Sequence, residues 1–257
     1  MLLSESEFQV IRAAGFALAV AAAVGLQRFA PHARLGGNWR VNAALWVVNG
    51  VLLAAVCGSC ACSVARWATD NGVGVLNRAG VPGWAALAVT VPFLDLISYA
   101  WHRANHRLGF LWRFHRVHHS DLDFTVSTGV RFHPGELILS LPLRLAAIVV
   151  LGAPVAGVLV FEVVFTLANL IEHGDIDYPP GFEGMVGAVL VTPAMHRRHH
   201  TRRRPELDSN FGTIFSFWDR VLRSYRSNSS AERIETGVPG VDRPLSVAEA
   251  LALPFLP

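Results

Sequence analysis

Long runs of apolar residues set the strongest limit on how this chain can fold. The blocks 8–26, 41–65 and 82–99 each have about 18 or more residues with few charges, the length of a helix that crosses a bilayer. Hydrophobic residues make up 52% of the chain and charged residues 16%, against roughly 25% charged residues in a soluble domain. The sequence therefore predicts an all-α, integral-membrane helical bundle.

Two further apolar helices are expected within 136–171, on either side of Gly152-Ala153-Pro154. Each is short for a full crossing, so we expect them to form a re-entrant or tilted helical hairpin. The segments 101–135 and 173–226 are polar and rich in histidine. We expect these two segments to form a cap outside the hydrocarbon.

The two ends of the chain belong to the same predicted unit. Glu5 and Glu7 precede the first apolar block, where a signal peptide would carry basic residues, so we expect an uncleaved span. The tail, 227–257, contains the capping-box sequence Ser246-Val-Ala-Glu249 at the start of a short apolar helix. Residues 1–257 are predicted to form a single membrane domain.

Arginine is distributed unevenly along the chain. All 22 basic residues are arginine. The segments 28–40, 102–131 and 197–226 contain three, five and eight of them, whereas the 66–78 loop contains two beside Asp70. The positive-inside rule places the three richer segments on the cytoplasmic side, so both histidine-rich segments lie on one face. The arginine-only, alanine-rich composition suggests a GC-rich bacterial genome, and hence a bacterial inner membrane.

The positive net charge does not indicate a nucleic-acid partner. The chain has a net charge of +3 and a pI of about 9.1. A surface that binds single-stranded nucleic acid places aromatic side chains among its basic ones. The run Arg202-Arg203-Arg204 contains no aromatic residue, so we expect no nucleic acid to bind.

Three cysteines lie within the second apolar block. Cys57 and Cys60 have the spacing of a redox motif, but no flanking βαβ pattern or polar surroundings. We expect these two residues and Cys62 to be small, buried helix residues, and we expect no disulfide.

Histidine is arranged in repeated short patterns. The chain has eleven histidines, and eight of them form one His-x3-His pattern and two His-x2-His-His patterns: His102 and His106; His115, His118 and His119; His196, His199 and His200. Residues three and four apart share a helix face, so each pattern can direct its imidazoles at a common point. Neutral imidazole is the commonest metal-ligating side chain and suits Zn, Cu, Fe and Ni. A solvated or pH-sensing patch is the alternative, and three such patterns disfavour it.

The number of histidines indicates how many metal ions the chain binds. His173 and His133 bring the set to nine or ten. That is too many imidazoles for one ion, and it fits two ions with about four or five ligands each. The patterns contain no cysteine, which argues against a thiolate-type zinc site.

Four separated motifs resemble one known family. The histidine patterns, together with VRFHPGE, NLIEHGD, TPAMHRRHH and SNFGTIFSFWDR, resemble the fatty acid hydroxylase / sterol desaturase superfamily over about Asp95–Arg226. Its members are integral-membrane, non-haem di-iron oxygenases. The resemblance implies these metal ligands: His102, His106, His115, His118, His119, His173, His196, His199 and His200. It also matches His133 to a family position, where the residue either binds the metal itself or contacts a residue that does.

The resemblance further implies an activity and its partners. We expect O2-dependent hydroxylation, or desaturation, of a membrane lipid such as a sterol or a fatty acyl chain. The expected cofactors are two iron ions, with O2 as co-substrate. Oxidising an unactivated C–H bond needs metal or cofactor chemistry, and no flavin or nicotinamide site is visible. Electrons are therefore expected from an external donor protein, such as ferredoxin, cytochrome b5 or a reductase.

Three polar residues within apolar helices are candidates for supporting roles. Asp95 lies seven residues before His102, on the same helix face, and is expected to accept a hydrogen bond from an imidazole N–H. Glu162 is expected to line the substrate cavity, and Asn169 to orient His173 one turn later.

Other residues of the matching motifs have ordinary structural interpretations. Capping or pairing with arginine is at least as good an explanation for the polar ones: Glu136, Asp175, Asp208, Asn210 and Asp219. The aromatic ones are expected to pack the cap: Phe211, Phe215, Phe217 and Trp218.

Two other functions compete with the oxygenase. A transition-metal transporter or sensor would place its ligands near the middle of several spans, whereas these histidines lie at span ends. A zinc-dependent lipid hydrolase would bind zinc and act without O2.

Overall fold

A computed structural model describes residues 3–33, 36–58, 60–227 and 234–256. Over these residues the chain is helical, and its β-structure is limited to three isolated bridges. The predicted all-α fold is therefore confirmed.

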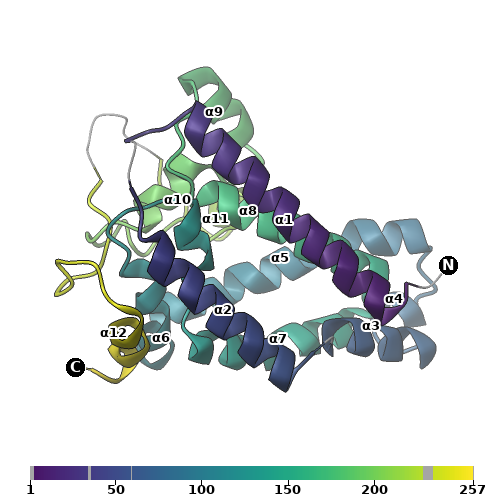
Figure 1. The fold of residues 1–257 in the computed structure, drawn as a ribbon. Coiled ribbons are helices and arrows are strands. Elements are labelled where there is room, and N and C mark those ends of the chain that lie inside the picture. The colour runs from purple at the N-terminus through teal and green to yellow at the C-terminus, as the bar shows by residue number, and fades with distance from the viewer. Residues whose placement is uncertain (1–2, 34–35, 59, 228–233, 257) are drawn as a thin grey trace.

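Five long helices form the body of the molecule (Figure 1): α1 (Glu5–Phe29), α2 (Trp39–Val56), α5 (Gly83–Arg107), α7 (Pro134–Leu151) and α8 (Val155–Glu172). Each is long and apolar enough to cross a membrane, alone or, for α2, together with the chain that follows. Most of their apolar residues are not buried inside the protein. That pattern fits a bundle whose outer surface contacts lipid, and the protein is an integral-membrane protein.

Shorter helices connect the long ones at both ends. Two follow α2: α3 (Cys60–Asp70) and α4 (Val75–Arg78). The others belong to the cap: α6 (Gly109–His119), η1 (Val126–Val130), α9 (Pro180–Gly187), α10 (Pro193–His199), α11 (Phe217–Val221), α12 (Val247–Ala252) and η2 (Leu253–Phe255). Helices α6, α10 and α12 lie at one end of the bundle, and α3 and α4 at the other (Figure 1).

The second predicted span is wrong as a single helix. Helix α2 ends at Val56, and α3 starts at Cys60 in place of one helix over 41–65. Gly58 has a φ of +52°, a left-handed conformation that glycine adopts at little cost and that ends an α-helix.

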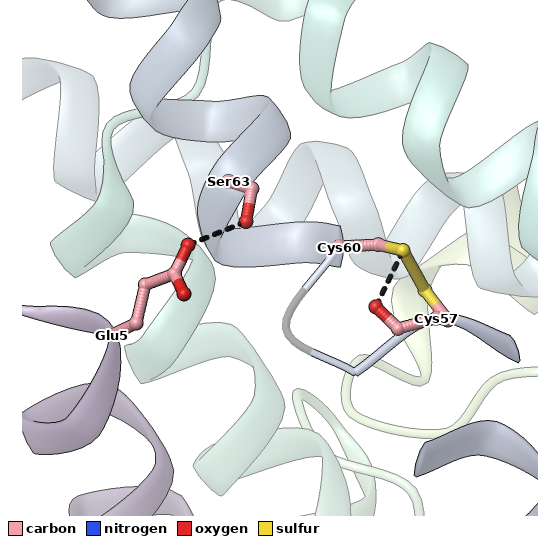
Figure 2. Close-up of a disulfide and its surroundings, with 4 residues drawn as sticks. All are labelled: Glu5, Cys57, Cys60 and Ser63. Carbon is pink, nitrogen blue, oxygen red and sulfur yellow. Dashed lines mark hydrogen bonds between the residues drawn. A yellow bond between two sulfur atoms is a disulfide. The ribbon is translucent and has the colours of Figure 1, made fainter. Parts of the chain in front are cut away.

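The prediction that the cysteines form no disulfide is also wrong. With the helix interrupted, the Cα atoms of Cys57 and Cys60 lie 5.2 Å apart and the two residues form a disulfide (Figure 2). Beside it, Ser63 at the start of α3 donates a hydrogen bond of 2.7 Å to Glu5 of α1. Cys62 is free and buried, as expected.

The third span is longer than predicted. Helix α5 continues past residue 99 to Arg107. It therefore carries His102 and His106 on its last two turns, at the end of the bundle where the cap lies.

The predicted helical hairpin consists of α7 and α8, but the expectation that each is short for a full crossing is wrong, because both are 18 residues long and are candidate spans. At 1.5 Å per residue each spans about 27 Å, close to the thickness of the hydrocarbon core. Gly152 turns the chain with a φ of +74°. A Cβ on Gly74 would lie 2.2 Å from the Gly152 nitrogen, so the loop before α4 packs tightly against this turn. The α3–α4 end of the bundle is thus the end away from His133 and His173.

A buried arginine ties the cap to the bundle. Arg131 is fully buried and donates to the Val117 carbonyl of α6 at 2.9 Å and to Asn42 of α2 at 2.8 Å. Asn42 in turn donates to Asp121 at 2.7 Å. These bonds fix the C-terminal end of α6, where three of the histidines lie.

The C-terminal helix packs on the cap. Ser246 and Glu249 form the predicted capping box at the start of α12. Ala250 and Leu253 then pack with Val117 of α6 and Leu45 of α2 in a small apolar cluster.

Candidate metal centre

Nine histidines from four helices converge at the cap end of the bundle. They fall into two groups. Within each group, one nitrogen of every ring lies within 4.8 Å of those of the other rings. One group has five members: His102, His106, His115, His119 and His199. The other has four: His118, His173, His196 and His200. The expected number of four or five ligands for each ion agrees with this division.

Both groups draw on α6 and α10, whereas α5 contributes only to the five-histidine group and the end of α8 only to the four-histidine group. On α6, His115 and His119 are four residues apart and belong to the five-histidine group, whereas His118 belongs to the other. At residues 196–200 the division is reversed. His196 and His200 belong to the four-histidine group, and His199 belongs to the five-histidine group. The expectation that each pattern aims at one common point is therefore wrong for both His-x2-His-His patterns.

Local sequence explains how the last pattern is placed. Thr192 caps α10 by accepting a hydrogen bond from the Met195 backbone N–H, and Pro193 occupies the first helical position, where its missing N–H is no loss. The resulting seven-residue helix directs its histidines into the cluster. The rings of His119 and His200 stack there with centroids 4.2 Å apart, so the two groups are adjacent.

One nitrogen of most rings is held by the protein. Backbone carbonyls lie within hydrogen-bond distance of the Nδ1 atoms of four histidines: His102 at 2.9 Å, His118 at 3.2 Å, His173 at 2.6 Å and His199 at 2.7 Å. A carbonyl only accepts, so each Nδ1 is protonated and donates. The Nε2 atoms of these rings are then unprotonated, the form that binds a metal.

The Nε2 atoms face one another at short range. Nε2 of His173 lies 3.0 Å from that of His118 and 2.9 Å from that of His196. Within the described residues, Nε2 of His102 and of His199 is buried without a hydrogen-bond partner. Facing lone pairs repel, and unpaired buried nitrogens are costly, unless a cation lies between them. This arrangement of ring nitrogens fits a pair of metal ions.

Burial keeps these imidazoles neutral. The loss of solvation lowers the pKa of His173 and of His199 to about 3. The same cause lowers the pKa of His118, His119 and His200 well below the usual value. Neutral rings at physiological pH are ready to bind a metal without first releasing a proton.

Glu136 supports the five-histidine group. Its Oε1 lies 2.8 Å from Nδ1 of His115 and accepts a hydrogen bond of 3.0 Å from Asn105. Its Oε2 is buried and has no partner among the described residues. A carboxylate in this position orients the ring and makes it a stronger ligand. The sequence interpretation of Glu136, capping or pairing with arginine, missed this contact.

Glu172 lies beside the four-histidine group, but beyond hydrogen-bond distance of its rings. One oxygen lies 3.8 Å from Nδ1 of His173, and the other lies 3.8 Å from Nδ1 of His196. The side chain is 1% exposed, which is rare for a carboxylate without a basic partner. Sequence analysis did not select Glu172, although an acid next to His173 at the end of an apolar helix was a usable signal.

A cavity borders both groups on the bundle side. Both carboxylates, Glu136 and Glu172, line it, together with His115 and His173. Phe132 from the chain before α7 and Phe165 of α8 add apolar walls. The cavity is small, about 80 Å³, so it holds a reacting carbon and a few neighbours rather than a whole lipid.

Asp95 has different partners from those expected. It accepts hydrogen bonds from the backbone N–H groups of Ile214 and Phe215, both at 3.1 Å, and from the Trp218 indole at 3.0 Å. The predicted imidazole contact is replaced by these three donors. Asp95 therefore anchors the FGTIFSFW segment to α5.

Glu162 differs from its predicted role, whereas Asn169 contacts His173 as expected. Glu162 lies 3.5 Å from Arg12 of α1 and is not among the residues that line the cavity. The Asn169 side chain donates to the Gly129 carbonyl at 2.7 Å, and it is the Asn169 backbone carbonyl that holds His173. Asn169 thus orients His173, but through the main chain.

His133 lies outside both groups. Its Nδ1 accepts from the Gly135 N–H at 2.9 Å, which caps α7, and its Nε2 lies 3.2 Å from the Leu251 carbonyl. The sequence matched His133 to a family position, either as a metal ligand or as a residue that contacts a ligand. In the structure it caps α7.

The remaining motif residues mostly have structural contacts. Asp219 accepts from the backbone N–H groups of Phe211 and Gly212, and Asn210 bonds the Met195 carbonyl. Phe211 packs against the rings of the five-histidine group, which supports its expected packing role.

Two further acids have contacts of different kinds. Asp175 accepts a hydrogen bond from the backbone N–H of Ala33, and Asp208 lies 3.6 Å from Nδ1 of His106.

A sequence model of the fatty acid hydroxylase family matches residues 87–224, more than half of the chain. The protein belongs to the fatty acid hydroxylase family. The matched range contains all nine clustered histidines and both cavity carboxylates. It agrees closely with the range over which the motifs resemble the superfamily.

Several curated relatives of this family member act on lipids by name. The chain is 29% identical to ornithine lipid hydroxylase OlsE of Rhizobium tropici over 55% of its length and 42% of the relative's. It is 30% identical to alkylglycerol monooxygenase of Caenorhabditis elegans, over 52% of its length and 26% of the relative's. It is 30% identical to lathosterol oxidase of Mus musculus, over 58% of its length and 49% of the relative's. In each case the aligned part is less than half of the relative. No solved structure matches the chain.

Proposed function

We propose that this protein is an O2-dependent lipid hydroxylase with a di-iron centre. The observation that supports this most directly is the pair of adjacent histidine groups, five and four rings, that border one cavity at the end of membrane-spanning helices. Bound at these groups, two iron ions would supply the O2 chemistry that amino-acid side chains lack. The reaction converts a C–H group, O2, two electrons and two protons into C–OH and water.

The residues around the cavity have separate tasks in this proposal. Phe132 and Phe165 contact the alkyl chain and exclude water from the reacting carbon. Glu136 holds the protonated Nδ1 of His115, which keeps Nε2 of that ring free for the metal. Glu172 places a buried carboxyl group beside two rings of the other group, where it can take up or release a proton.

The substrate is proposed to be a bilayer lipid that reaches the cavity along its hydrocarbon chain. Helices α5 and α8 carry cavity residues and are themselves candidate spans, so a chain in the membrane interior approaches from the bundle side. The names of two relatives, a hydroxylase and a monooxygenase, favour hydroxylation over desaturation.

We further propose that the metal centre faces the cytoplasm of a bacterial cell and the α3–α4 end faces outward. The arginine-rich segments lie at the cap end, in agreement with the positive-inside rule. The Cys57–Cys60 disulfide lies at the start of α3 (Figure 2), and α3 lies at the opposite end (Figure 1). Disulfides persist in the oxidising periplasm and are rare in the cytoplasm. Two unrelated features therefore favour the same orientation, which also exposes the centre to cytoplasmic ferredoxins, cytochromes or reductases.

Lipid analysis with labelled oxygen tests the activity. Cells that express the protein or its His199→Ala variant are grown under isotopically labelled O2, and their extracted lipids are compared by mass spectrometry. We expect one lipid class to gain a single labelled oxygen atom in cells with the unaltered protein alone. A product that lacks two hydrogens would indicate a desaturase. Cleaved lipids formed without O2 would indicate the zinc hydrolase, and both outcomes contradict the proposal.

A further inference from the structure

A second cavity lies near the five-histidine group and shares no lining residue with the substrate cavity. It has a volume of about 550 Å³, and α6, the segment after α10 and the C-terminal tail line it. Its apolar wall includes Leu207 and Leu253, and its charged wall consists of three arginines: Arg116, Arg202 and Arg204. Nothing in the proposed reaction requires this cavity for the lipid.

Trp112 connects this cavity to the histidines. Its side chain lines the cavity, and its ring centroid lies 5.0 Å from that of His106 and 5.4 Å from that of His119. One aromatic ring therefore contacts two members of the five-histidine group and also reaches the cavity.

The arginines give the rim a positive charge. The Arg204 side chain is 64% exposed and lies 3.6 Å from Asp208, and the Arg202 side chain is 27% exposed and binds Asp242 at 2.8 Å. Arg116 also lines the cavity, so its three arginines outnumber these two acids. In the sequence, 102–131 contains five arginines and two acids, and 197–226 contains eight and three. These segments therefore carry a net charge of +8, whereas the whole chain carries +3. Three of their arginines are buried (Arg131, Arg197 and Arg198), and the other ten are at least partly exposed. An acidic macromolecule is attracted to such a surface, and its association becomes faster and salt-dependent.

We propose that this arginine-rimmed cavity is the docking site of an acidic one-electron carrier protein, and that Trp112 forms the contact through which its electrons reach the five-histidine group. The proposal rests on the proposed function, because hydroxylation consumes two electrons for each O2. Two reduced carriers dock in turn, each is oxidised by one electron, and the two protons come from solvent. The charge of the rim and the Trp112 contact favour this occupant over a lipid headgroup, which would need no route to the histidines.

Binding of a plant-type [2Fe–2S] ferredoxin, an acidic one-electron carrier, tests the docking site. The full-length, metal-loaded protein in nanodiscs is compared with a double variant, Arg202→Gln with Arg204→Gln. The matched control is Arg223→Gln with Arg226→Gln, two exposed cap arginines that do not line the cavity. We expect about tenfold weaker ferredoxin binding for the first pair, little change for the control, and weaker binding with rising salt.

A second variant tests the electron route. Trp112→Phe keeps an aromatic ring against the histidines and shortens its reach into the cavity. At saturating ferredoxin we expect slower reduction of the metal centre, with unchanged metal content and unchanged reduction by dithionite. This readout is independent of the lipid reaction, so it remains informative if the substrate proposal fails.

Three results would overturn the docking proposal. Equal ferredoxin affinity for both double variants would mean that the cavity rim has no special role. Unchanged ferredoxin binding together with a loss of affinity for anionic vesicles would assign the arginines to the membrane surface. Unchanged reduction of Trp112→Phe by ferredoxin would exclude the aromatic route.

Discussion

Nε2 of His196 lies 2.9 Å from Nε2 of His173, although 23 residues separate the two histidines in the chain. The Asn169 carbonyl holds the other nitrogen of His173, so its Nε2 is unprotonated and directs its lone pair toward His196. A cation between the rings converts a repulsive contact into two bonds. The predictions below follow from that arrangement of ring nitrogens.

Loss of one histidine should release one metal ion rather than two. His199→Ala removes a ligand from the five-histidine group, and His200→Ala removes one from the four-histidine group. We expect each variant to keep about one ion per chain and to lose measurable hydroxylation. Metal content by mass spectrometry and lipid analysis check this.

His133→Ala is the matched control for these variants. It removes a histidine that caps α7 and belongs to neither histidine group. We expect two metal ions to remain and the free energy of unfolding to fall by about 1 kcal/mol, the usual effect of a lost cap. Loss of a metal ion from this variant would place His133 among the ligands.

Replacing Glu136 should weaken metal binding in the five-histidine group. Glu136→Ala removes the acceptor for His115 Nδ1, whereas Glu136→Gln retains a weaker one. Loss of a carboxylate behind a metal-ligating histidine typically costs 10–100-fold in affinity or activity, so we expect that range for Ala and a smaller effect for Gln. Competition with a chelator measures the affinity. Equal affinity of both variants and the unaltered protein would mean that Glu136 does not support the metal.

Glu172→Gln should lower the rate of hydroxylation about 10–100-fold while the protein still binds two metal ions. The amide has the shape of the carboxylate, so packing around the 1% exposed side chain is retained. It can neither release nor take up a proton beside the Nδ1 atoms of His173 and His196, whereas a carboxyl group can. Turnover under saturating donor, measured with metal content on the same samples, checks this prediction. An unchanged rate would assign Glu172 a purely structural role.

The disulfide reports the orientation of the protein in the membrane. Cys57 and Cys60 lie at the α3–α4 end, opposite the metal centre, and Cys62 is buried. In intact spheroplasts, a membrane-impermeant phosphine followed by an impermeant maleimide should label Cys57 and Cys60. A cysteine placed at Arg226 in the cap should remain unlabelled. Labelling of the cap position and protection of the disulfide would reverse the proposed orientation.

The apolar blocks and histidine patterns predicted the spans and the histidines that come together. Both signals are local, because span length and three- or four-residue spacing can be read along the chain. Gly58 shows the limit of this reading: one left-handed residue divides an apolar block into two helices, and the divided chain brings Cys57 and Cys60 into bonding distance.

Contacts between distant segments could not be predicted in the same way. The division of residues 115–119 between two groups depends on how α10 docks against α6. Asp95 shares a helix face with His102, but the FGTIFSFW segment returns to that face and supplies its donors. The cavity between the helices, which gives Glu136 and Glu172 their importance, exists only after the bundle has packed.

Anomalous X-ray scattering at the iron absorption edge, from crystals of the iron-loaded protein, tests the central claim most directly. The account predicts two adjacent iron peaks, one surrounded by the ring nitrogens of the five-histidine group and the other by those of the four-histidine group. A single peak, or peaks bound away from these nine histidines, would contradict it.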